Sequence, residues 1–238
     1  MKQRNIYART LLVFVGVVCC STHALGGQSV AQYRNFELGS TLASVSAVTK
    51  TTSSDVKTIH QRPAVLQDLE WRPSHWTSGA TDPSTISTDP VEQILFSFYN
   101  DQLFRLVVDY RRERTEGMTT ADMIEATSAV YGPPLGRTSR AAGAPSRLEV
   151  ESGTPIARWG DAQHGVVLYQ SSSYGVAFRL IVTDLRVDAL ARTADTQARR
   201  LDDQEAPQRD LARQQKERDD DRAAAAKARA ANKGVFRP

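Results

Sequence analysis

Three histidines lie beyond the first 24 residues, and histidine is the side chain best suited to bind metal or transfer protons near neutral pH. They are His60, His75 and His164. None has the spacing that places two metal ligands on one face of a helix. A hydrolase centre would have to be built by loops, for example from His75 and His164. We predict no catalytic residues, metal or cofactor, and favour a non-catalytic protein.

Two shorter patterns could also do chemistry. Ser54 and Lys57 match the S-x-x-K motif, which needs one helical turn to bring the amine to the hydroxyl. That segment instead reads as a loop entering a strand. Asp68 and Glu70 would share one face of a strand, as a pair of acid–base carboxylates could. With Arg72 beside them, a solvated strand edge is the favoured interpretation.

Five residues are the candidates for binding. His75 and Trp76 lie in a long loop rich in Pro, Ser and Thr, where a tryptophan can be an interaction hot spot or can pack back onto the body. Arg105 is a charged residue on the partly wet face of a predicted strand. Phe236 and Arg237 follow a very polar segment and could form a docking hook; the alternative is an unstructured terminus.

Two helices are predicted from matching starts. Gly39–Val45 and Gly117–Met123 both read Gly-x-Thr-x-Ala-x-apolar. A hydroxyl at the start can accept the first free backbone N–H groups of a helix. We therefore expect helices over about 40–50 and 119–131, the second ended by Gly132 and the prolines after it.

Two β-hairpins follow from runs rich in β-branched and aromatic residues. The first joins Ile94–Tyr99 to Leu103–Tyr110 through Asn100-Asp101, and the second joins 166–169 to 176–182 through a Ser-rich loop. Tyr33 to Leu38 or Lys57 to Gln61 could add edge strands.

The two halves also repeat one another. Phe104–Val108 recurs as Phe178–Val182, and a tryptophan in an extended segment, Trp71 or Trp159, precedes each hairpin. Three matches in the same order predict a tandem repeat, with chance similarity as the alternative. The expected fold class is α+β: two helix–strand–hairpin units, about 36–110 and 114–185, form an antiparallel sheet of about six strands. Both helices cover one face of that sheet, in a domain over 32–186.

Residues 1–24 have the pattern of a secretory signal peptide. A basic start is followed by an apolar run, Leu11–Cys20, and small residues precede a cleavage site after Ala24. An uncleaved anchor and lipidation at Cys19 or Cys20 are the alternatives. We expect an exported protein in the periplasm or outside the cell, with no membrane span after cleavage and a possible outer-membrane association.

Composition limits the function after export. The chain has 238 residues, 40% of them hydrophobic and 24% charged, as in an ordinary globular protein. Removing three basic residues with the signal peptide leaves 30 − 3 = 27 basic against 27 acidic residues. This neutral balance argues against nucleic acid as a partner. Both cysteines are also removed, so the exported chain has no disulfide.

Residues 187–238 form a predicted charged helical tail. Acid-before-base pairs four residues apart support a solvated helix, for example Asp188/Arg192, Asp195/Arg199 and Glu205/Arg209. The fold class therefore includes a long charged C-terminal helix, which Pro207 should break or kink, and we expect two helical segments.

Several short motifs resemble the SmpA/OmlA group. Gly39-x-Thr41 and Gly117-x-Thr119 are similar to the helix entry of that group, and Tyr131-Gly132-x-Pro134 is similar to its helix exit. Phe98-x-Asn100-Asp101-x-Leu103 resembles its hairpin turn. These are small outer-membrane assembly lipoproteins, related in fold to β-lactamase inhibitor proteins. The resemblance covers about 36–185 and implies a non-enzymatic interaction module.

The expected function is therefore a non-catalytic interaction or scaffold module of the cell envelope, with an envelope or secreted protein as its partner. The alternatives are an envelope hydrolase with a loop-built site and a carrier of a small hydrophobic ligand between helices and sheet.

Overall fold

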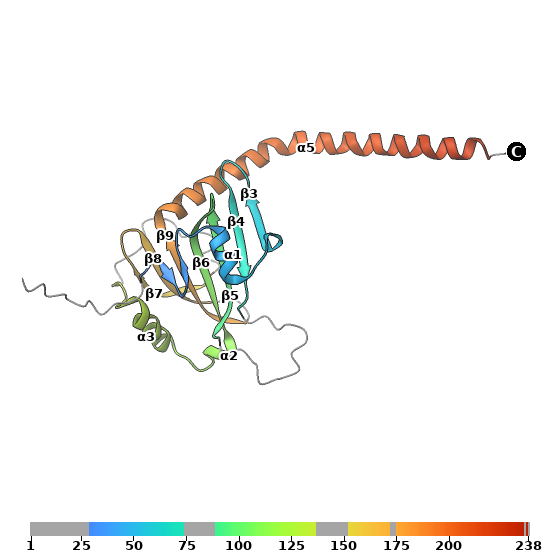
Figure 1. Cartoon of the computed structure of the whole chain (residues 1–238). Coiled ribbons are helices and arrows are strands. Elements are labelled where there is room, and N and C mark those ends of the chain that lie inside the picture. Colours follow the sequence, from blue (N-terminus) through green and yellow to red (C-terminus); the bar gives the residue numbers. More distant parts are fainter. Residues whose placement is uncertain (1–28, 74–88, 137–151, 172–174, 236, 238) are drawn as a thin grey trace, which may run out of the picture.

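The computed structural model describes residues 29–73, 89–136, 152–171, 175–235 and 237. The predicted signal peptide and the candidate binding residues His75, Trp76 and Phe236 lie outside this part of the chain. Within it, the fold is α+β, as predicted: an antiparallel sheet with helices and a long C-terminal helix (Figure 1).

The first unit contains a small two-stranded ribbon, a helix, a 3-10 turn and four strands of the main sheet. Its elements are β1 (Gln32–Tyr33), β2 (Phe36–Glu37), α1 (Leu42–Thr49), the 3-10 turn Ser53–Asp55, β3 (Val56–His60), β4 (Leu66–Trp71), β5 (Val91–Tyr99) and β6 (Gln102–Arg111).

The second unit repeats the order of helix, tryptophan strand and hairpin, and the long helix follows it. Its elements are α2 (Arg112–Thr115), α3 (Thr120–Tyr131), β7 (Thr154–Gly160), β8 (His164–Gln170), β9 (Val176–Asp184) and α5 (Leu185–Lys233).

The main sheet has seven antiparallel strands in the order β3-β4-β5-β6-β9-β8-β7. The prediction of about six strands omitted β3, which was expected only as a possible edge strand. The segment from Tyr33 did not join this sheet, because β1 pairs with β2 instead. The two units meet where β6 pairs with β9.

The helices begin where the sequence predicted. The Thr41 hydroxyl accepts the Ser44 backbone N–H at 3.2 Å. At α3, Thr119 and Asp122 cap one another's backbone N–H groups, at 3.2 and 2.7 Å. Glycine ends α3 because Gly132 has a φ of 82°, which residues with a side chain rarely adopt.

The main core lies between the sheet and the helices α1 and α3. Val45 of α1 and Met123 of α3 pack with buried strand residues such as Leu69, Phe96 and Leu168. Both predicted tryptophan strands contribute to this face, with Trp159 buried and Trp71 partly buried. The helices α1 and α3 therefore cover one face, as expected.

The opposite face of the sheet receives the start of α5. Val187 and Ala191 of α5 pack on Leu66 and Phe104 in a second, smaller cluster. Val107, Tyr169 and Ile181 form a third buried cluster on the same face. Asp109 lies two strand alternations from Arg105 on this same face and is buried, so the face that was expected to be partly wet at Arg105 is dry at Asp109.

The tail is a long helix, as expected, and it is continuous rather than divided in two. α5 runs from Leu185 to Lys233 with Pro207 inside it. Proline removes one backbone hydrogen bond without breaking the helix here, and Figure 1 shows α5 changing direction on its way out from the sheet. Buried residues end at Ala198, so the distal half stands in solvent. No helix in the described part of the chain is both long and apolar enough to cross a membrane.

Candidate functional site

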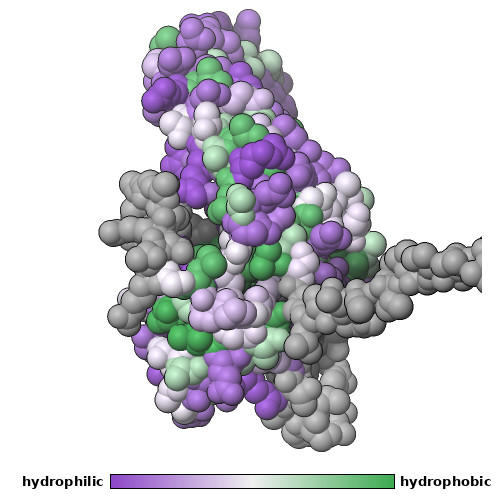
Figure 2. All heavy atoms as spheres, turned by 90° about the vertical axis from the view of Figure 1, so that its left-hand side faces the viewer, coloured by the Kyte–Doolittle hydropathy of each residue, from purple (hydrophilic) through white to green (hydrophobic). Residues whose placement is uncertain are grey.

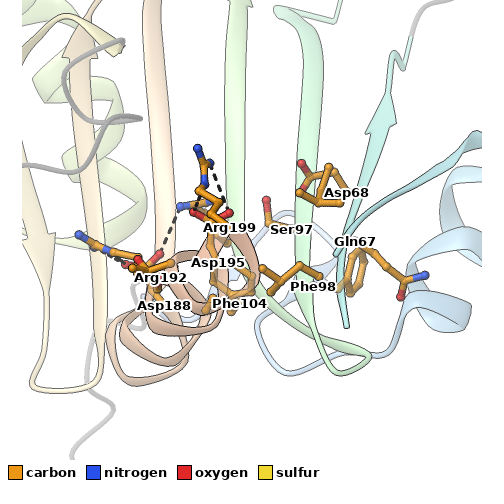
Figure 3. Close-up of a pocket in the computed structure, with 14 residues that line it drawn as sticks. Gln67, Asp68, Ser97, Phe98, Phe104, Asp188, Arg192, Asp195 and Arg199 are labelled. Carbon is orange, nitrogen blue, oxygen red and sulfur yellow. Dashed lines mark hydrogen bonds and ion pairs between the residues drawn. The ribbon is translucent and has the colours of Figure 1, made fainter. Parts of the chain in front are cut away.

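A groove of about 390 Å³ lies between the start of α5 and the sheet. Figure 3 shows α5 residues Asp188, Arg192, Asp195 and Arg199 on one side, and the strand residues Asp68 and Ser97 on the other. The polar residues Gln67, Arg105 and Thr196 also line it, together with five apolar residues: Ile59, Leu66, Phe98, Phe104 and Ala191. We call this feature the α5 groove.

Arg105 points into the α5 groove next to a β-bulge in β6. Ser97 of β5 pairs with Arg105, but the next β5 residue, Phe98, pairs with Leu103, so Phe104 is the extra residue. A bulge of this kind lets two successive side chains point to the same face. The Arg105 guanidinium carbon consequently lies 5.1 Å from the centre of the Phe104 ring, in cation–π range.

Arg105 connects the sheet to α5 through Asp188. The Nη1 group of Arg105 donates to Asp188 Oδ1 at 3.2 Å. Arg192 approaches the other carboxylate oxygen of Asp188 and donates from Nε at 2.7 Å. The Asp188 side chain is only 3% exposed. Two guanidinium groups therefore balance one buried carboxylate.

Two more contacts hold α5 to the β3–β4 edge. His60 Nε2 lies 3.1 Å from Asp195 Oδ1, and Arg62 pairs with Glu205. The predicted pairs Asp188/Arg192 and Asp195/Arg199 are confirmed. Glu205 and Arg209 make no direct ion pair among the described residues, because Glu205 pairs with Arg62 and Arg209 pairs with Asp202. The hydrogen bond from Arg62 lowers the pKa of Glu205, and the nearby Arg209 charge still helps to lower it.

Asp68 lies on the floor of the α5 groove. Strand register places Lys57, Asp68, Ser97 and Arg105 side by side across four strands. Burial raises the pKa of Asp68 above its usual range, while the positive charges of Arg105 and Lys57 oppose that rise. Three arginines and three aspartates line the groove, so its charges cancel. Such a surface is better suited to hydrogen bonding with a peptide segment that carries both polar and apolar side chains than to attracting a charged ion.

The histidines do not form a site in the described part of the chain. His60 is on β3 and His164 on β8, and four strands separate them in the sheet. His164 Nδ1 lies 3.4 Å from Asp161, whose carboxylate also caps the turn before β8. Among the described residues, no three His, Cys, Asp or Glu side chains are close enough to hold a metal ion.

The remaining sequence patterns do not meet the geometry of their motifs. Ser54 lies in the 3-10 turn and bonds Thr52, whereas Lys57 is on β3, so no helical turn joins them. Asp68 faces the α5 groove, while Glu70 pairs with Arg72 at 2.9 Å at the exposed edge. The solvated edge predicted for Asp68 and Glu70 is therefore found at Glu70, but the prediction was wrong for Asp68, which is partly buried in the groove.

A second pocket, of about 330 Å³, lies between α2, α3 and the sheet. We call it the tyrosine pocket, because Tyr33, Tyr110 and Tyr131 line it together with apolar residues such as Met123 and Leu180. Burial raises the pKa of all three phenols. The Tyr131 hydroxyl donates to the Gln32 carbonyl at 2.9 Å. Figure 2 shows several hydrophobic residues gathered on the lower half of the molecular face in view, beneath a mostly hydrophilic upper part.

Of the predicted binding residues, Arg105 is in the α5 groove, and Arg237 is exposed just beyond the end of α5. They lie at opposite ends of the long helix and do not form one site (Figure 1). Sequence reasoning missed Asp68 as a groove residue and Asp188 as the partner of Arg105. The Asp188/Arg192 spacing indicated that both residues lie on one face of a helix, but it could not indicate which strand that face would contact.

Comparison of the chain with protein-family models, with curated proteins and with solved structures finds no match. The resemblance to the SmpA/OmlA group therefore stays a prediction from short motifs, and the site has to be interpreted from its own geometry.

Proposed function

We propose that this protein is a non-catalytic interaction module of the cell envelope that holds a segment of an envelope or secreted protein in the α5 groove. Export by residues 1–24 would place it in the periplasm or outside the cell. The observation that carries the proposal is the groove itself: an opening of about 390 Å³ between a helix and a sheet, lined by both apolar and ion-paired side chains.

The charges of the groove support binding rather than catalysis. Catalytic groups need a reactive partner poised next to them. Asp188 and Asp195 are instead each engaged by arginine, and Arg105 is engaged by Asp188. The paired groups offer fixed hydrogen-bonding positions beside apolar patches, which is the mixture found in protein interfaces.

Two neighbouring α5 positions provide a sharp test. Thr196 lines the groove, whereas Gln197 is exposed and lies about 100° further round the helix. A photo-crosslinking amino acid at position 196 should give a discrete protein adduct in living cells, and the same group at 197 should not. Thr196→Trp should abolish an adduct formed from a second groove position, Gln67, while Gln197→Trp should leave it intact. Equal adducts at 196 and 197, or none at either, would refute the proposal.

A second candidate function, carriage of a small apolar molecule, is favoured by the tyrosine pocket. Its volume of about 330 Å³ is at the lower end of the range for ligand sites, and apolar side chains with a few hydroxyl groups line it. A fluorescent apolar probe such as N-phenyl-1-naphthylamine should bind the wild type. Ala126→Trp should block the pocket, and Glu125→Trp, one position away and outside the lining, should not. Equal probe binding by all three proteins would exclude this candidate.

A further inference from the structure

The charges of α5 are distributed unevenly along its length. Residues 185–221 contain eight basic and ten acidic residues. Residues 222–238, which we call the tip, contain five basic residues and no acidic one. These are Arg222, Lys227, Arg229, Lys233 and Arg237. The net charge therefore changes from 8 − 10 = −2 to +5 at the end of the helix.

Ion pairs within the helix stop where the tip begins. Arg213 pairs with Asp210 at 2.7 Å, and Arg222 pairs with Asp219 at 3.5 Å. Beyond Arg222, no ion pair is found in the described part of the tip. Lys227, Arg229 and Lys233 are exposed there without a carboxylate close by. Their charges are consequently available to an external partner.

Helix stabilisation explains only part of this pattern. Cations favour the negative end of a helix dipole, but the effect fades beyond the last turn. Lys233 is in that turn, whereas Arg222, Lys227 and Arg229 are further back. Arg222, Arg229 and Lys233 are seven and four residues apart, so they fall within about 40° of one another on one face of the helix. Between them lie mostly alanines, which let the cationic groups reach a flat surface.

The fold holds the tip away from the body. The exposed stretch from residue 207 to 233 would be roughly 40 Å long at 1.5 Å per residue. Figure 1 shows this part of α5 alone, with the C-terminus at its far end. The tip therefore does not neutralise the acidic residues of its own sheet domain.

We propose that the tip docks on a membrane surface rich in anionic phospholipid. Clustered Lys and Arg residues are attracted to such surfaces. After the helix, Val235 is 79% exposed, and the sequence adds Phe236 before Arg237. An apolar pair within a basic segment suits the boundary between lipid headgroups and acyl chains. The phosphate backbone of a nucleic acid would offer this apolar pair no apolar surface to contact. The contact is independent of the α5 groove, so either proposal can fail alone.

Vesicle co-sedimentation of the full chain tests this proposal. The tip variant carries Arg222→Gln, Lys227→Gln, Arg229→Gln and Lys233→Gln. The matched control removes four cations from the middle of the same helix: Arg209→Gln, Arg213→Gln, Lys216→Gln and Arg218→Gln. All proteins share one N-terminus, so any contribution from residues 1–24 is common to them.

Wild type should bind phosphatidylcholine vesicles that contain about one-third phosphatidylglycerol and release them at about 1 M salt, where the Debye length is ~3 Å. The tip variant should lose at least tenfold in partition, and the control less than threefold. Equal losses, or wild-type binding to pure phosphatidylcholine that matches the anionic vesicles, would overturn the proposal. Tighter binding to a DNA duplex than to the anionic vesicles at the same salt would assign the tip to nucleic acid instead.

Discussion

Arg179 on β9 donates from Nε and Nη2 to the two carboxylate oxygens of Asp109 on β6, at 2.6 and 2.9 Å. The two residues are cross-strand neighbours at the seam between the two units. Their side chains are 15% and 4% exposed, so the pair is nearly buried. A two-point arginine–carboxylate contact fixes both distance and orientation, and so it fixes the register of the seam.

The same seam explains why Arg105 pairs with a residue of α5 rather than with a neighbouring strand. Val107 and Ile181 are equivalent in the repeat and pair with each other, which relates β6 and β9 by an approximate two-fold axis. This axis makes Arg105 the equivalent of Arg179, and Thr183 the equivalent of Asp109. Thr183 carries no charge, so Arg105 has no cross-strand carboxylate on β9. Arg105 forms its ion pair with Asp188 on α5 instead.

Asp109→Asn should destabilise the protein by roughly 3 kcal/mol, because it leaves the nearly buried Arg179 charge without a counterion. The measurement is the free energy of unfolding in urea. A double replacement, Asp109→Leu with Arg179→Leu, should recover most of that loss, because no unpaired charge remains. If the double variant is less stable than Asp109→Asn, the pair contributes through packing and this account is wrong.

Arg105→Gln should loosen the start of α5. Asp188 would keep only Arg192, and losing a hydrogen bond to a buried charge costs about 1–3 kcal/mol. Amide hydrogen exchange should accelerate over residues 187–199 and stay unchanged in β8 and β9. The control is Arg213→Gln, whose partner Asp210 is exposed, and it should change stability by less than about 0.5 kcal/mol. Similar acceleration in both variants would contradict the role given to Arg105.

Asp68 should make the protein less stable as the pH rises above the usual carboxyl pKa of about 3.9. Burial raises the pKa of Asp68 in the folded state, so in this window the folded state binds more protons than the unfolded chain, and the free energy of unfolding falls with pH. Asp68→Asn should remove this component and be at least as stable as wild type at neutral pH. Urea unfolding at several pH values measures both effects, and an unchanged pH profile in the variant would disprove the assignment.

Pro207→Ala should stiffen α5. Proline cannot donate to the Asp203 carbonyl, and alanine in a helix interior is favoured over proline by about 3 kcal/mol. Spin labels on cysteines introduced at Lys57 and Lys216 should report a narrower distance distribution, with higher helicity by circular dichroism. Gln208→Ala is the control and should leave the distribution as it is. A broader distribution in Pro207→Ala would show that proline does not cause the bend.

The α+β fold class could be predicted because its signals are local. Thr41 and Thr119 cap their helices through neighbouring backbone groups, and Gly132 ends α3 through its own φ angle. The turn at Asn100 and Asp101 has positive φ values, at 47° and 66°, in residues that tolerate them. Each of these features depends on residues a few positions apart, which the sequence displays directly.

The candidate site could not be predicted, because it depends on contacts between distant segments. Phe104-Arg105 and Phe178-Arg179 are the same two residues in the two units, yet Phe178 packs in the main core and Phe104 packs under α5. The difference is the bulge opposite Ser97 and Phe98, which β8 and β9 lack at the equivalent place. Which face a strand residue occupies depends on pairing register, and register depends on the partner strand.

The sequence by itself determined most of the helix and strand segments, their order in the two units and the charge pattern of the tail, since each is visible in short stretches of residues. Only the tertiary structure decided that β3 joins the sheet, that α5 continues through Pro207, and that Arg105 meets Asp188. These outcomes depend on which surfaces can be buried together, and that becomes defined only when the chain is folded.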